Sequence, residues 1–140
     1  VERLGVEHLL VVGHHGCSGV QAALEGTRVG LADHWIRHVR DVRARHADGL
    51  ANLPQHAQAK ALCELNVIEQ VVNTCSSTVL VDAWQAGQKI HVHGCVYSLR
   101  DGLLRDLEIS INAESGWRRI YDAAVEQVFE RHAEANYSTL

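Results

Sequence analysis

A glycine-rich turn with a histidine and a cysteine three residues apart constrains this chain more than any other feature. The turn reads Gly13-His14-His15-Gly16-Cys17-Ser18-Gly19 and follows an apolar run, Val6–Val12. The run predicts a fully buried parallel strand, and a helical pattern follows the turn. Because open α/β sheets bind ligands beyond the carboxyl ends of parallel strands, the turn is a candidate binding site.

His14 and Cys17 could hold one metal ion together, and the pairing of an imidazole with a thiolate suits zinc. Zinc needs about four ligands, so these two residues alone do not define a site. Two other interpretations stay open at this point. The glycines can serve only a tight strand-to-helix turn, with both side chains incidental. The second interpretation is a nucleotide-binding loop. The glycines of such a loop follow the pattern G-x-G-x-x-G, whereas the glycines of this turn follow G-x-x-G-x-x-G.

The rest of the chain alternates between helical and strand patterns. Helices are predicted over Val20–Glu25, from about residue 31 to the high 40s, after Pro54, over Thr78–Ala86 and from Trp117 onward. Strand patterns cover Ile90–His93 and Asp106–Ile111, with a two-residue hairpin signal at Asp101-Gly102. This order predicts the α/β class: a mainly parallel sheet flanked by helices, with an antiparallel edge strand.

Composition limits the partners and the setting. The 140 residues carry a formal net charge of −4, which argues against nucleic acid or an anionic membrane as a partner. No apolar run reaches the length of a membrane-spanning helix. The four cysteines are expected to be reduced thiols in a cytoplasm, with Cys63, Cys75 and Cys95 as buried small hydrophobes. The chain has no methionine and begins with Val1, so we expect further residues before Val1 in the natural protein.

Ten histidines are many for a chain of this size. Those on predicted helices among charged residues are interpreted as surface residues: His34, His38, His46, His56 and His132. His91 and His93 alternate outward on a predicted strand and could bind a metal only with a third ligand. Many arginines and alanines with few lysines are typical of a GC-rich bacterial genome.

Several downstream segments resemble the β class of carbonic anhydrases. Gly30–Asp41 resembles the helix that follows the zinc turn in that family, and Leu62–Val71 resembles its next long helix. Ala83-Trp84, Gly87-Gln88 and His93–Leu107 resemble its late strand and hairpin. Because the similarity runs through nearly the whole chain in the expected order, we interpret residues 1–140 as a single β-carbonic anhydrase-like domain.

The resemblance implies a reaction and a set of site residues. The family binds Zn²⁺ with two cysteines and one histidine, which makes His14 and Cys17 two implied ligands. The implied reaction is the reversible hydration of carbon dioxide to bicarbonate and a proton by zinc-bound hydroxide. Backbone N–H groups at Ser18 and Gly19 would favour the charge of bicarbonate. His15 is a candidate for proton transfer to buffer.

The resemblance also implies assembly and a second site. Family members form dimers or larger assemblies, so a homodimer or homotetramer is implied. Tyr97 matches a tyrosine that some bacterial members use in an inhibitory bicarbonate site. The upstream tryptophan and arginine of that site are not visible in this sequence.

One family motif is missing from this chain. The third zinc ligand and the catalytic Asp–Arg pair of the family come from an earlier Cys-x-Asp-x-Arg motif. Asp41 and Arg43 have its spacing, but Val39 stands in place of the cysteine. We therefore expect the carboxy-terminal two-thirds of a β-carbonic anhydrase, truncated at its N-terminus. The alternatives are a catalytically inactive scaffold or oligomerisation protein, or one half of a split enzyme.

Overall fold

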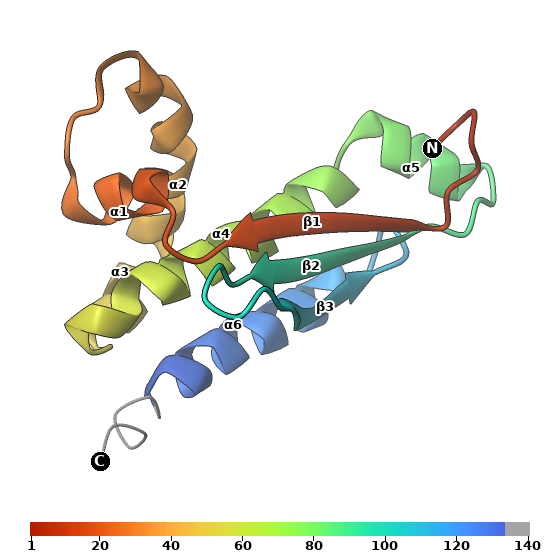
Figure 1. Ribbon diagram of the computed structural model, residues 1–140. Helices are drawn as coiled ribbons and strands as arrows, with labels where there is room; N and C mark the ends of the chain where they lie inside the picture. The colour runs from red at the N-terminus through yellow and green to blue at the C-terminus, as the bar shows by residue number, and fades with distance from the viewer. Residues whose placement is uncertain (134–140) are drawn as a thin grey trace.

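The computed structural model describes residues 1–133, which form a three-stranded sheet packed against long helices (Figure 1). In chain order the elements are β1 (His8–His14), α1 (Ser18–Glu25), the 3-10 helix η1 (Gly30–Ala32), α2 (Asp33–Arg45), α3 (Ala47–Ala51), α4 (Gln55–Cys75), α5 (Thr78–Gln85), β2 (His91–Tyr97), β3 (Leu104–Ile111) and α6 (Trp117–Ala133).

The sheet has the order β1-β2-β3, with β1 parallel and β3 antiparallel to the central strand β2. This arrangement confirms the predicted α/β class and its antiparallel edge strand. The register of the parallel pair sets His14 opposite Tyr97. Both residues therefore lie at the carboxyl end of the parallel strands, where ligands bind in this class of fold.

Strand β1 differs from the fully buried strand predicted over Val6–Val12. Its side chains alternate between exposed and half-buried, and Leu10 and Val12 are 58% and 51% exposed. The reason is its place at the edge of the sheet, where α4 covers only one of its faces. Exposed apolar side chains on an edge strand form a surface suited to contact with another strand or chain.

Helix α4 is the centre of the core. It begins directly after Pro54, as predicted, and its stripe of Ala61, Leu65 and Ile68 is almost completely buried against the sheet. Helix α6 packs on α4 and β3, whereas α1 and α2 gather beyond the arrowhead of β1 (Figure 1). Among residues 1–133, none of the helices combines the length and apolar character that crossing a membrane requires.

The helix predicted from about residue 31 to the high 40s is divided into η1, α2 and α3. Its backbone leaves the helical conformation at His46, where φ is −112° and ψ is 23°. Leu31 and Trp35, part of the predicted apolar stripe, are exposed, whereas Val42 is buried. Helical spacing therefore identified the helix but not the extent of its buried face.

The connection between β2 and β3 also differs from the prediction. Instead of a two-residue hairpin at Asp101-Gly102, the chain forms a longer loop over residues 98–103. The N–H of Ser98 donates to the carbonyl oxygen of Leu103 at 3.1 Å, and the N–H of Gly102 donates to the carbonyl oxygen of Ser98 at 2.9 Å. The Asp-Gly pair thus forms a turn inside a loop that these bonds close.

Gly94 lies on β2 between Ile109 of β3 and Val71 of α4, where the packing leaves no space for a side chain. A Cβ atom at this position would lie 2.6 Å from Cγ2 of Ile109 and 3.1 Å from Cγ2 of Val71. Replacing Gly94 with valine should therefore lower the free energy of unfolding by about 3 kcal/mol, since the core has no room to yield. Urea denaturation measures the change.

Gly19→Ala is the matched control for that substitution. A Cβ atom at Gly19 would meet nothing closer than 3.7 Å, and alanine favours the helical backbone of α1. The urea midpoint of this variant should stay unchanged or rise slightly. A Gly94→Val variant as stable as the parent would contradict the close packing of β2 on α4.

Candidate metal centre

The glycine-rich turn joins the carboxyl end of β1 to the amino end of α1. His14 is the last residue of β1 and is exposed, and Cys17 is the half-buried N-cap of α1. The N–H of His15 donates to the carbonyl oxygen of Tyr97 at 3.0 Å, which ties the turn to β2. The predicted strand–turn–helix is therefore present, with His14 and Cys17 at the ligand-binding end of the sheet.

The ring of His14 is oriented by the backbone beside it. Its Nδ1 lies 3.1 Å from the carbonyl oxygen of His15. Because a carbonyl oxygen only accepts hydrogen bonds, Nδ1 carries the proton and Nε2 is left as the acceptor nitrogen. Histidines that bind metals are oriented in this way by a hydrogen bond from their second nitrogen.

The two cysteines near the turn differ in role. Cys17 is the half-buried N-cap of α1, and its side chain forms no capping hydrogen bond to the helix. Cys63 of α4 is buried beneath the turn, and its Sγ donates to the carbonyl oxygen of His14 at 3.0 Å. Burial, with the nearby Glu64 and Cys17 charges, raises the pKa of the Cys63 thiol to about 12. Cys63 therefore supports the turn as a protonated thiol.

The donor types fit zinc, but their number falls short. An imidazole nitrogen and a thiolate sulfur are donors that zinc prefers, and a catalytic zinc site uses three protein ligands. Residues 1–133 contain no group of three His, Cys, Asp or Glu side chains that could hold a metal ion. Asp41 and Arg43, which have the spacing of the family's Asp–Arg pair, are exposed on α2. Of the residues in the turn, His14 and Cys17 are thus two donors of types that zinc prefers, one fewer than a catalytic zinc site uses.

A buried carboxylate beneath the turn escaped the sequence analysis. Glu64 of α4 is 2% exposed, and its Oε1 accepts from Nε2 of His15 at 3.0 Å. Its Oε2 accepts from the Arg131 guanidinium at 2.7 Å and from Nε2 of His132 at 3.0 Å. These bonds connect the turn to the carboxyl end of α6 through the core.

Glu64 is held in its charged form. Burial raises the pKa of its carboxyl, but hydrogen bonds from His132 and His15, with the charges of His132 and Arg131, outweigh burial and lower the pKa to about 2. A buried charge is tolerated only when it is paired and hydrogen-bonded in this way. Removing Glu64 would thus disturb both the turn and α6.

Two sequence signals could have revealed this network. Glu64 interrupts the buried apolar run Ala61–Leu65, and a charge in such a run needs partners. His132 continues the buried stripe of α6 that comprises Tyr121, Ala124 and Val128. The prediction of a surface position for His132 is wrong, since it is 6% exposed and bonded to Glu64.

The remaining histidines and cysteines mostly match the expectations. His34, His38 and His56 are exposed, and Cys63, Cys75 and Cys95 are buried free thiols. His46 is half-buried rather than exposed, because it packs beside Phe129 at the end of α2. Burial and the charge of Arg45 lower the pKa of His46.

The structure also places the other candidate site residues near the turn. Ser18 and Gly19 form the first turn of α1, where backbone N–H groups have no acceptor inside the helix. Tyr97 ends β2 opposite His14 and is partly exposed. These residues share one end of the sheet with His14 and Cys17, and their roles stay predictions.

His91 and His93 gain a third neighbour, His8 of β1. The three ring centroids lie 5.2 to 6.1 Å apart, and Nδ1 of His8 shares a hydrogen bond of 2.9 Å with Nε2 of His93. Nδ1 of His93 bonds to the hydroxyl of Ser110 at 2.8 Å. Both ring nitrogens of His93 are therefore engaged in hydrogen bonds and are not available to a metal ion. The three histidines form a stack of rings on the open face of the sheet.

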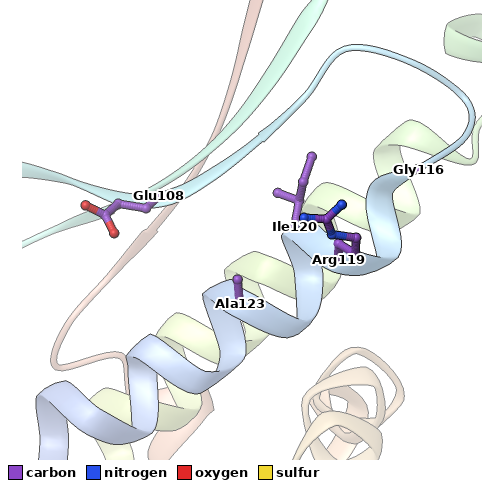
Figure 2. Close-up of a pocket in the computed structure, with 5 residues that line it drawn as sticks. All are labelled: Glu108, Gly116, Arg119, Ile120 and Ala123. Atoms are coloured by element: carbon purple, nitrogen blue, oxygen red, sulfur yellow. The ribbon is translucent and has the colours of Figure 1, made fainter.

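A hollow of about 410 Å³ lies between β3 and α6 (Figure 2). It is lined by Glu108, Gly116, Arg119, Ile120 and Ala123. In Figure 2 the carboxylate of Glu108 on the strand lies apart from the guanidinium of Arg119 on the helix. None of the residues of the turn lines this hollow, so it is separate from the candidate centre.

Comparison with known proteins identifies the family of this chain. Residues 1–104 match the family model described as carbonic anhydrase. A carbonic anhydrase of Emericella nidulans is 39% identical over 110 residues, which are 78% of this chain and 48% of the relative. The chain thus spans about half the length of the curated relatives it matches.

Solved structures show the same fold. The β-carbonic anhydrase of Coccomyxa, solved with acetazolamide, has a TM-score of 0.77 and 32% identity, and the match covers all of this chain and 62% of that one. A β-carbonic anhydrase of Sordaria macrospora, described as tetrameric, has a TM-score of 0.70 and 26% identity over 79% of this chain and 57% of that one. The chain belongs to the carbonic anhydrase family, and within it to the β class.

Proposed function

We propose that this chain is the carboxy-terminal part of a zinc-dependent enzyme that reversibly hydrates carbon dioxide to bicarbonate and a proton. The observation that carries the proposal is the His14–Cys17 pair at the carboxyl end of β1, with Nε2 of His14 left free. Since the chain spans about half of its curated relatives, we assign the family's third ligand and its Asp–Arg pair to residues outside this chain.

When bound, zinc would lower the pKa of a water molecule from about 15.7 to about 7, which makes hydroxide available at neutral pH. The chain's own residues prepare the place for it. The carbonyl oxygen of His15 orients the His14 ring, and the Cys63 thiol holds the carbonyl oxygen of His14. The amides of Ser18 and Gly19 would stabilise the negative charge of bicarbonate.

His15 stays the candidate for proton transfer. Its Nε2 donates to Glu64, which makes the buried carboxylate its partner on the side away from the solvent. Tyr97 stays the candidate for a second bicarbonate site, on the strength of its place opposite His14. Both roles are part of the proposal.

We further propose a homodimer or homotetramer. The exposed side chains of Leu10 and Val12 on the edge strand support this assembly, because they leave an apolar surface open. The cytoplasmic location and the bacterial source stay predictions.

An inactive scaffold is the second candidate, favoured by the presence of only part of a zinc site in residues 1–133. Zinc analysis and stopped-flow carbon dioxide hydration separate the two. For the enzyme we expect zinc bound in stoichiometric amount and rapid hydration by the natural full-length protein, and no activity from residues 1–140 alone. A metal-free, inactive full-length protein that still forms oligomers would establish the scaffold.

A split enzyme would give a third result. The chain would then be inactive alone and become active when a second polypeptide that carries the missing cysteine is added.

A further inference from the structure

A cavity of about 360 Å³ lies beside Glu64, and its lining includes His15 of the turn. The cavity lies among the first half of α4, the loop between β2 and β3, and the last turns of α6. Its charged lining consists of four basic residues, Lys60, Arg100, Arg105 and Arg131, and two acidic residues, Glu64 and Asp101. Four cations and two carboxylates leave a formal surplus of two positive charges.

Both carboxylates are already engaged by the protein. Glu64 accepts hydrogen bonds from His15, Arg131 and His132. Asp101 accepts from the Arg105 guanidinium and from the N–H of Leu103 at 3.0 Å. Neither acid is therefore free to neutralise the remaining cations.

Two of the basic side chains have no partner of their own. Within residues 1–133, neither the ammonium group of Lys60 nor the guanidinium of Arg100 forms a hydrogen bond or ion pair, and both side chains are exposed. Arg131 gives one nitrogen to Glu64 and keeps further donors. A concave site with unpaired cations concentrates anions.

We propose that this cavity binds the phosphate group of a small molecule, held by Lys60, Arg100 and Arg131. The surplus of two charges matches a phosphate group, which carries about −1.5 to −2 at neutral pH. Guanidinium groups bind phosphate oxygens with paired hydrogen bonds, and lysine adds a point charge. The volume lies within the range of small-molecule sites, roughly 300 to 1,000 Å³.

Two sources can supply this chemistry: free phosphate and a small phosphomonoester. The site lies beyond the proposed function, because neither carbon dioxide nor bicarbonate contains a phosphate group. None of the proposed phosphate-binding residues, Lys60, Arg100 and Arg131, is a proposed zinc ligand, so zinc content reports on the proposed function independently.

Isothermal titration of the purified protein with inorganic phosphate and with glycerol 3-phosphate, at low ionic strength, tests the site. Binding of either supports it, and the tighter of the two identifies the source. Lys60→Gln or Arg100→Gln alone should weaken binding about threefold, and the double variant about tenfold or more. Circular dichroism checks that each variant is folded.

Lys89→Gln is the matched control, because Lys60 and Lys89 are the only lysines of the chain and Lys89 precedes the opposite end of β2. This variant should bind phosphate as the parent does. The proposal is overturned if the parent binds neither compound, if the double variant binds as tightly as the parent, or if Lys89→Gln weakens binding equally.

Discussion

Replacing Cys17 with serine should remove zinc from the protein that carries this chain and lower carbon dioxide hydration by roughly 1,000-fold or more. The hydroxyl group of serine is a poor substitute for a soft thiolate donor. Without the metal, a water molecule keeps its pKa of about 15.7, and no hydroxide nucleophile forms at neutral pH. Zinc analysis of the purified protein and stopped-flow hydration measure the two losses.

Cys75→Ala is the control for this substitution. Cys75 ends α4 and is buried as a free thiol, and burial raises its pKa to about 11. This variant should keep both zinc and activity. A Cys17→Ser protein with its full zinc content would exclude Cys17 as a ligand.

Replacing Glu64 with leucine should lower the free energy of unfolding substantially. The substitution leaves His132 buried without its hydrogen-bond acceptor and frees His15 from α4. Breaking a buried charge network of this kind costs about 3 kcal/mol. Urea denaturation at pH 7 measures the free energy of unfolding of both proteins.

The same carboxylate should make stability depend on pH. The pKa of Glu64 is about 2 in the folded protein, below its ordinary value of 4.5. A lowered pKa stabilises the fold fully above pH 4.5, and this contribution disappears as the pH falls toward 2. The parent should therefore lose more stability than Glu64→Leu across this interval.

Glu126→Gln on the exposed side of α6 serves as the comparison. It should follow the parent at every pH, since Glu126 is exposed and takes no part in the Glu64 network. Parallel acid denaturation of the parent and Glu64→Leu would show that the Glu64 network does not stabilise the fold.

Local patterns predicted those parts of the fold that depend on neighbours in sequence. Pro54 marked the start of α4, apolar spacing identified α6, and the alternation around Ile109 identified β3. The strand–turn–helix at His14 and Cys17 was predicted from glycine spacing and an apolar run. All of these signals lie within one element or one turn.

The parts that were missed depend on residues far apart in the chain. Glu64 is bonded to residues 49, 67 and 68 positions away, and no local pattern contains such a separation. The exposure of Leu10 and Val12 depends on which strand lies at the edge of the sheet. Periodicity predicts a strand but does not give its place in the sheet order.

X-ray absorption at the zinc edge, on the natural protein that carries this chain, tests the central claim most directly. We predict nitrogen from one imidazole at about 2.0 Å and sulfur from two thiolates at about 2.3 Å around each zinc ion. His14→Ala and Cys17→Ser should each abolish or strongly reduce the zinc signal, because each substitution removes one ligand. A zinc environment without sulfur, or one unchanged by both substitutions, would contradict the assignment of His14 and Cys17 as ligands.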